Sequence, residues 1–532
     1  MIRDGKLWIA NTKTGEPVYV LPKMANRHGL IAGATGTGKT ITLKVMAESF
    51  SDMGVPVFLA DVKGDIAGMI NPGKDSEDMQ KRIAKFGLAT QGFEYHKYPV
   101  TLWDVFGKNG IQIRTTITEM GPLLLSRILD LNENQSSILS IIFKIADESN
   151  LALIDTKDLK AMLNYVADNN KEFEADYGTL NKQSIGVIQR AVVALEMAGG
   201  DQFFGEPAID IRDWFTVGEQ GRGMIHILDS QSLINNGTLY STFLLWMLSE
   251  LFETMPEVGD LDKPKMVFFF DEAHLLFKDT PKPLLEKIEQ VVKLIRSKGI
   301  GVYFVTQNPR DIPDGVLAQL GNKVQHALHA YTPSDQKAVK AAADSFRENP
   351  AFKTADVIEA LGTGEAVVSF LQEDGTPAVV EQVDILPPQS QMGGISDSER
   401  DAAIKASLLF SKYANGYDAE SAFELLARMG VEKAEAEAKA KADAEAAKAD
   451  AEAAKAAAKE QAAAEKAAAK EAEKEANRRK RAAKSVGTTV AGTVGREVGK
   501  KVGKQLGGKF GQTLGGNTGA QLLRGLLNTL IK

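Results

Sequence analysis

The sequence predicts an α/β fold in which a mainly parallel sheet is flanked by helices. Strand and helix patterns alternate over the first 390 residues, as they do in chains built from strand–helix–strand units. The strand candidates are short, continuous apolar runs, which are typical of strands with both faces buried. A glycine-rich turn also stands between one such strand and a helix, which is a common start for a fold of this class.

The expected strands follow from these apolar runs. The first two are predicted to form a hairpin, because Thr14-Gly15 lies between them. In chain order the expected strands are Leu7–Ala10, Val18–Leu21, His28–Ala32, Val55–Ala60, Met224–Leu228, Met266–Phe270, Ile300–Val305, Val324–Leu328, Glu365–Leu371 and Ala378–Val383.

Four further regions differ in composition from this sheet-forming part, which we assign to residues 1–390. Apolar residues at helical spacing predict a helical insertion at 119–200. A Pro-Pro-Gln linker leads to a predicted pair of helices at 391–430, which begins with the capping box Ser396-x-x-Glu399. Residues 431–484 hold 25 alanines among charged residues and predict a single solvated helix or linker.

The last segment, 485–532, is basic and repeats glycine every four residues. From residue 477 onward there are 12 lysines and arginines against one acidic residue, Glu497, although the whole chain carries −7. This spacing is that of a glycine zipper, which allows close helix approach. The segment therefore predicts self-association or contact with an anionic membrane surface, and a flexible solubilising tail stays the alternative.

The composition is that of a globular protein without a membrane span. Hydrophobic residues make up 44% and charged residues 25%, and neither a signal peptide nor an 18-residue apolar run is found. The chain has no cysteine, so disulfides, thiolate metal sites and cysteine nucleophiles are excluded. We expect a cytoplasmic location.

The glycine-rich turn has the spacing of a phosphate-binding loop. It reads Gly33-Ala34-Thr35-Gly36-Thr37-Gly38-Lys39-Thr40, between the strand at 28–32 and a helical pattern. Glycines let backbone N–H groups turn toward phosphate oxygens, and the helix N-terminus adds a favourable field. Lys39 is expected to reach the β- and γ-phosphates of ATP, and the Thr40 hydroxyl to bind Mg²⁺.

Two later strands end in side chains that suit phosphoryl transfer. Asp271 and Glu272 follow the apolar run at 266–270; we expect Asp271 to hold Mg²⁺ and Glu272 to polarise the attacking water. We expect His274 to pack near the site. Gln307 ends the strand at 300–305 and is expected to contact the γ-phosphate or the water.

Other charged residues have weaker assignments. Asp61 or Asp65, after the strand at 55–60, contacts the metal shell or simply forms a turn. Arg296, Arg310 and Lys323 are the candidates for a cation that stabilises charge on the γ-phosphate.

Together these motifs resemble the HerA/FtsK superfamily of P-loop ATPases, and within it the YjgR-like group of HerA-like helicases. The similarity covers residues 1 to about 430. It is carried by Gly33–Thr40, Asp61-Val-Lys-Gly-Asp65, Pro99–Gly107, Asp271–His274, Thr306–Pro309 and Val324–Leu328. The resemblance implies a RecA-like core, ATP hydrolysis and a hexameric ring in which one subunit supplies a cation to its neighbour's ATP. The residue aligned with that cation is Lys323, where the family carries arginine.

The leading hypothesis is therefore a Mg²⁺-dependent ATPase that drives a DNA translocase or helicase. Any DNA contact is expected to be with the backbone, since no base-reading motif occurs. An alternative is an ATP-driven switch or protein-remodelling ATPase that docks to a membrane surface, or to itself, through the glycine-zipper tail. A third hypothesis is a non-enzymatic, nucleotide-binding scaffold. The presence of Glu272 and Gln307 argues against it, because nucleotide binding alone requires neither residue.

Overall fold

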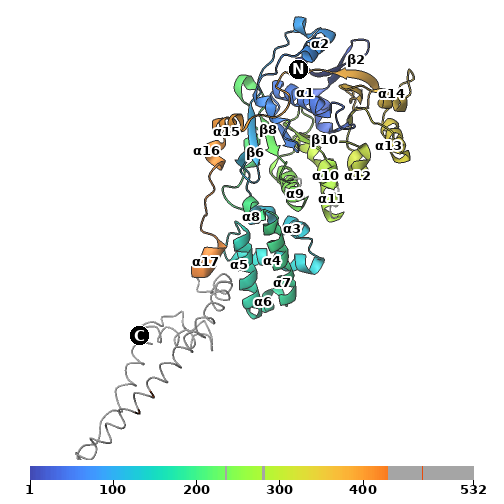
Figure 1. Cartoon of the computed structure of the whole chain (residues 1–532). Coiled ribbons are helices and arrows are strands. Elements are labelled where there is room, and N and C mark those ends of the chain that lie inside the picture. The colour runs from blue at the N-terminus through green and yellow to red at the C-terminus, as the bar shows by residue number, and fades with distance from the viewer. Residues whose placement is uncertain (234–236, 278–281, 429–465, 467–469, 471–532) are drawn as a thin grey trace, which may run out of the picture. The chain divides into compact units, whose positions relative to one another are not determined.

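The computed structural model describes residues 1–233, 237–277, 282–428, 466 and 470 (Figure 1). The segments expected at 431–484 and 485–532 lie outside the described residues, apart from two single positions. All described residues up to 428 belong to one compact unit. Among the described residues, no helix combines the length and the apolar character needed to cross a bilayer.

Thirteen strands of the described part join in one mixed sheet, so the expected mainly parallel sheet is extended by an antiparallel edge. Neighbours from β11 to β7 run parallel, whereas β12, β13, β2 and β1 add antiparallel pairs. Strand β3 (Pro17–Val20) pairs with β2 as the expected hairpin. In order across the sheet the strands are β1 (Ile2–Arg3), β2 (Lys6–Thr12), β13 (Glu381–Ile385), β12 (Glu365–Ser369), β11 (Asn322–Gln325), β4 (Gly29–Ala32), β10 (Ile300–Thr306), β9 (Met266–Phe270), β5 (Val57–Asp61), β8 (Ile225–Asp229), β6 (Val100–Asp104) and β7 (Ile111–Gln112).

Helices cover both faces of the parallel strands, which makes the core a RecA-like three-layer arrangement. Because successive side chains of a strand point to opposite faces, Phe268 and Phe270 pack toward α9 and α11, whereas Val267 and Phe269 pack toward α1. The helices around the sheet are α1 (Lys39–Asp52), α2 (Glu77–Lys85), α9 (Gly237–Thr254), α10 (His274–Phe277), α11 (Lys282–Ile295), α12 (Asp314–Leu317), α13 (Pro333–Asp344) and α14 (Thr354–Ala360).

A group of helices follows β7 and precedes β8, in the region where the sequence predicted an insertion (Figure 1). They are α3 (Ile117–Ile128), α4 (Glu133–Glu148), α5 (Thr156–Asp168), α6 (Asn170–Tyr177), α7 (Lys182–Met197) and α8 (Gly200–Phe203). Three helices, α15 (Asp397–Ala406), α16 (Phe410–Tyr413) and α17 (Ala422–Arg428), come after the sheet in place of the expected pair. The Ser396–Glu399 capping box forms as predicted. The division into domains stays a prediction.

Two expected strands are placed differently. In place of Ala378–Val383, the structure has β13 at Glu381–Ile385. The apolar run Val324–Leu328 predicted a strand over its whole length, but β11 begins at Asn322 and ends at Gln325. Beyond that point Ala327 O accepts a hydrogen bond from Ala34 N (2.8 Å), and the His326 ring turns inward. Contacts with the phosphate loop therefore replace sheet pairing.

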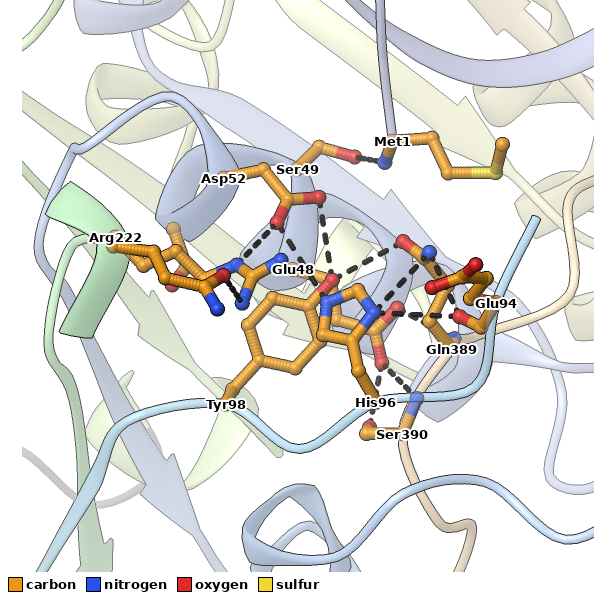
Figure 2. Close-up of polar contacts among 12 residues, drawn as sticks. Met1, Glu48, Ser49, Asp52, Glu94, His96, Tyr98, Arg222, Gln389 and Ser390 are labelled. Carbon is orange, nitrogen blue, oxygen red and sulfur yellow. Dashed lines mark hydrogen bonds and ion pairs between the residues drawn. The ribbon is translucent and has the colours of Figure 1, made fainter. Parts of the chain in front are cut away.

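The linker after β13 contains a segment, residues 389–391, that α1 holds in place and that we call the strap. Gln389 and Ser390 are buried, and both donate backbone N–H groups to the Glu48 carboxylate (2.8 and 3.0 Å), to which the Ser390 hydroxyl also donates (Figure 2). One turn earlier on α1, Lys44 Nζ donates to the Gln391 carbonyl. The helix that begins at the phosphate loop thus binds the strap through two buried charges.

The same polar cluster continues to the last turn of α1 (Figure 2). Asp52 accepts a hydrogen bond from Arg222 Nε (3.0 Å), and its Oδ2 lies 3.3 Å from the Tyr98 hydroxyl. That hydroxyl is 3.2 Å from Gln389 Oε1, and His96 Nε2 is 3.8 Å from Asp52 Oδ1. The cluster therefore joins α1, the strap and the segment before β6.

We expect Glu48→Ala to lower the free energy of unfolding by about 3 kcal/mol, because three buried donors lose their acceptor and the positive charge of Lys44 loses a nearby negative charge. Urea unfolding followed by tryptophan fluorescence measures the change. The control is Glu359→Ala on the exposed face of α14, for which a change within about 0.5 kcal/mol is expected. Equal stability of the two variants would contradict the assigned role of Glu48.

Candidate functional site

The loop from Gly33 to Thr40 leaves β4 at its carboxyl end and leads directly into α1, in the expected order of strand, loop and helix. Gly33, Gly36 and Gly38 have φ values of +152°, +80° and +111°, which L-residues with a side chain rarely adopt. Gly33 also packs closely: a Cβ there would lie 2.5 Å from the His326 Cβ. Glycine is therefore required by both conformation and space.

The Lys39 ammonium group lies across this loop. Its Nζ donates to the carbonyls of Gly33 (2.6 Å) and Ala34 (3.0 Å), and the residue is only 6% exposed. Burial lowers the pKa of Lys39, although the charges of Glu272 and Asp271 act in the opposite direction. The side chain of Thr40, in the first turn of α1, is partly exposed beside it.

The acid pair ends the fully buried strand β9, and both side chains are almost inaccessible, at 3% for Asp271 and 4% for Glu272. Burial raises the pKa of Asp271 to about 7. Its Oδ1 accepts a hydrogen bond from Glu272 N (2.9 Å), whereas its buried Oδ2 has no protein partner. Glu272 has a φ of +46°, a left-handed conformation that costs a non-glycine residue roughly 1–3 kcal/mol.

Three side chains surround the Glu272 carboxylate. Lys63 Nζ forms an ion pair with Oε1 at 2.6 Å, Gln307 Nε2 donates to Oε2 at 3.2 Å, and His274 Nδ1 lies 3.3 Å from Oε2. Burial alone would raise the pKa of Glu272, but the Lys63 ion pair and the Gln307 amide lower it below its usual value. His274 thus lies next to the site, as expected.

Gln307 connects the acid pair with the phosphate loop. While its amide nitrogen donates to Glu272, its Oε1 accepts a hydrogen bond from Thr35 Oγ1 at 3.4 Å. This contact follows from the strand order, because β10 lies between β4 and β9 and all three are parallel. Their carboxyl ends meet at one edge of the sheet, where ligands of open α/β sheets bind.

Of the two acids after β5, Asp61 holds a turn. Its Oδ1 accepts the backbone N–H groups of Lys63 (3.2 Å) and Gly64 (2.7 Å), and Oδ2 accepts that of Ile66 (3.0 Å). Both carboxylate oxygens of Asp61 therefore accept hydrogen bonds within the turn, which favours a structural role in the turn over contact with the metal shell. Asp65 Oδ1 is buried without a protein partner.

Two contributors to the site were not predicted. Lys63 lies two residues after Asp61, the last residue of β5. This position at the carboxyl end of a strand was the one feature of the sequence that could have indicated a role for Lys63 in the site. His326 donates Nδ1–H to the Glu365 carbonyl (2.8 Å), so its Nε2 accepts from the Thr42 hydroxyl (2.8 Å). Burial lowers the pKa of His326 to about 4, which keeps the ring neutral.

The three candidate cations occupy different places. Arg310, in the short turn Pro309–Asp311, is exposed just after Gln307 at the carboxyl end of β10. Arg296 precedes β10 at the opposite end and lies 3.9 Å from Asp260. Lys323 donates to the Ser345 carbonyl (2.9 Å), and burial lowers its pKa.

The residues present fit a magnesium ion bound together with a nucleotide. Among the described residues, no group of three or more His, Asp or Glu side chains forms a site of its own. Mg²⁺ in phosphoryl-transfer sites is usually held by one or two protein oxygens together with phosphates and waters. The partnerless Asp271 Oδ2 and the Thr40 hydroxyl are oxygens of this kind.

Comparisons with known proteins extend this picture. The chain is 22% identical over 370 residues to the DNA double-strand break repair helicase HerA of Sulfolobus acidocaldarius, and 24% identical over 379 residues to that of Sulfurisphaera tokodaii. Each match covers 69% of this chain and 66%, just under two thirds, of the relative. Among solved structures, VirB4 of Thermoanaerobacter pseudethanolicus aligns with a TM-score of 0.44 and 15% identity over 72% of this chain and 97% of VirB4.

The broadest match is to a family model described as "Helicase HerA-like C-terminal", which aligns with residues 6–513. This alignment includes the phosphate loop, the acid pair and the strand that carries Gln307. The chain therefore belongs to the helicase HerA-like C-terminal family.

Proposed function

We propose that the protein is a Mg²⁺-dependent ATPase. The observation that carries the proposal is the position of Gln307, which contacts Thr35 of the phosphate loop on one side and Glu272 on the other. The loop and the acid therefore lie within one side chain of each other, as hydrolysis of a loop-bound triphosphate requires.

Each side chain has a distinct part in this reaction. The Lys39 ammonium group exchanges the Gly33 and Ala34 carbonyls for the β- and γ-phosphates. Thr40 and Asp271 hold Mg²⁺, which supplies positive charge next to the phosphates when bound. Glu272 orients the attacking water and accepts its proton, and Gln307 fixes the carboxylate beside the loop.

We further propose that ATP hydrolysis drives a motor that moves or unwinds DNA, working as a hexameric ring in the cytoplasm. Membership in the family supports this, as do two relatives whose names describe DNA double-strand break repair helicases. In a ring, one subunit can supply a cation to its neighbour's nucleotide. Arg310 suits this role best, because it is exposed at the nucleotide edge, whereas Lys323 is engaged and Arg296 lies at the far end of β10.

We expect Glu272→Gln to lower ATP turnover at least about 100-fold while ATP binding is retained, because the amide accepts no proton. Phosphate release measures turnover, and a fluorescent ATP analogue measures binding. Glu286→Gln on the exposed side of α11 is the matched control and should leave both unchanged. Undiminished turnover of Glu272→Gln would overturn the assignment of the base.

Duplex or single-stranded DNA should stimulate ATP turnover, and the stimulation should fall steeply as salt rises, because backbone contacts release counterions. Turnover of the full chain and of a version ending at Gly430 is compared with duplex DNA, single strands and anionic liposomes. Stimulation by DNA in both proteins supports the motor. Stimulation by liposomes alone, lost on truncation, would support a membrane-docked switch instead.

Arg310→Ala should lower turnover roughly 10³-fold if this guanidinium stabilises the γ-phosphate of a neighbouring subunit. Arg296→Ala serves as the control and should stay within about twofold of the unaltered protein. Mixing Arg310→Ala with Glu272→Gln should restore part of the activity, since in trans both defects can fall in the same site and leave a neighbouring site with an intact Glu272 and an intact Arg310. No restoration in the mixture would rule out action between subunits.

A further inference from the structure

The ion pair between Lys63 and Glu272 has no part in the reaction proposed above, yet it occupies the group that must meet the water. The ammonium group lies 2.6 Å from Glu272 Oε1, one of the two oxygens that could accept a proton. A carboxylate held in this way is turned toward a cation instead of toward a nucleophile. The arrangement therefore needs a change before hydrolysis, and the surroundings of Lys63 indicate which one.

The backbone that presents Lys63 is fixed. The Asp61 carboxylate, 2% exposed, accepts the N–H groups of Lys63, Gly64 and Ile66. Gly64 has a φ of +75°, a conformation that residues with a side chain rarely adopt. The loop cannot carry Lys63 away from the site as a whole, and any movement must come from the side chain.

The Lys63 side chain has room to move. Its exposed fraction is 40%, against 5% for the Glu272 side chain with which it pairs. The Lys63 side chain is therefore paired with the carboxylate and still partly open to solvent. Four rotatable bonds let a lysine head group shift by several ångströms while its backbone stays in place.

The Lys63 ammonium group also lies near the phosphate loop. Burial lowers the pKa of Lys39, and the positive charge of Lys63 lowers it further, so the two ammonium groups lie close enough to repel each other. Lys39 lies across the phosphate loop, and Gln307 joins that loop to Glu272. Lys63, Glu272 and Gln307 thus form a chain of contacts that leads to the loop across which Lys39 lies.

We propose that Lys63 is a positioning residue that holds Glu272 while the site lacks a triphosphate and moves its ammonium group to the terminal phosphate when a triphosphate binds. This inference rests on the proposed ATPase function. A terminal phosphate carries more negative charge than a carboxylate and attracts the ammonium group more strongly. Once released, Glu272 keeps its Gln307 contact and is free to accept the hydrogen bond of the water.

The same movement distinguishes triphosphate from diphosphate. A diphosphate fills the loop without placing a phosphate between the two lysines, so Lys63 stays on Glu272. The site then releases its base only when there is a bond to hydrolyse. Lys63 thus contributes to the affinity for the triphosphate and not to that for the diphosphate.

The test uses the full chain and compares Lys63→Met with Lys63→Arg, each alone and combined with Glu272→Gln. Binding of a non-hydrolysable ATP analogue and of ADP is measured by fluorescence titration with Mg²⁺ present. Lys63→Met should weaken analogue binding roughly tenfold and leave ADP binding within about twofold, because one charge-assisted contact is lost. Lys63→Arg should retain most of the affinity. The control is Lys81→Met, which removes a solvent-exposed ion pair with Glu77.

The Glu272→Gln background separates the proposed movement from simple pairing. If Lys63 reaches the phosphate, Lys63→Met should still weaken analogue binding when its partner carboxylate is already gone. If Lys63 only neutralises Glu272, the effect should vanish there. Thermal unfolding checks that both variants are folded. In folded variants, a vanished effect, or equal losses of affinity for the analogue and for ADP, would overturn the inference.

Failure of the inference can be told apart from failure of the proposed function. An unaltered protein that turns over ATP, together with Lys63 variants that bind both nucleotides normally, contradicts only the role of Lys63. An unaltered protein that hydrolyses no ATP with or without DNA contradicts the proposed function itself.

Discussion

The position of β10 between β4 and β9 is the constraint on which the site depends. Adjacent strands lie about 4.8 Å apart, so one intervening strand places the phosphate loop and the acid pair roughly 10 Å from each other. That gap accommodates a terminal phosphate and a water, and Gln307 from the intervening strand spans it.

The charges in this gap are nearly balanced without a ligand. Lys39 and Lys63 face Asp271 and Glu272, and all but Lys63 are almost inaccessible to water. Such groups are costly to bury unless each has a partner. Lys39 uses loop carbonyls and Glu272 uses Lys63, whereas Asp271 Oδ2 has none. Of these charged groups, Asp271 therefore has the one oxygen that the protein itself leaves without a partner.

Much of this could be predicted from the sequence, because strands buried on both faces leave continuous apolar runs, as Met266–Phe270 does. The phosphate loop is also local, since its glycines, lysine and threonine are consecutive. Contacts between distant segments leave no such pattern. Lys63 meets Glu272 across more than 200 residues, and the shortening of the strand after Val324 depends on His326 binding Thr42. The strap looked like an ordinary linker, because nothing local reveals that Glu48 binds it.

The strap gives α1 a second task. This helix begins at the turn that cradles phosphate, runs for about 20 Å, and grips the strap with Lys44 and Glu48 in its central turns. The chain at Gln391 is therefore attached to a helix whose N-terminal end borders the phosphate loop. The point at which the chain leaves the sheet toward α15 is therefore anchored on the same helix that begins at the phosphate loop.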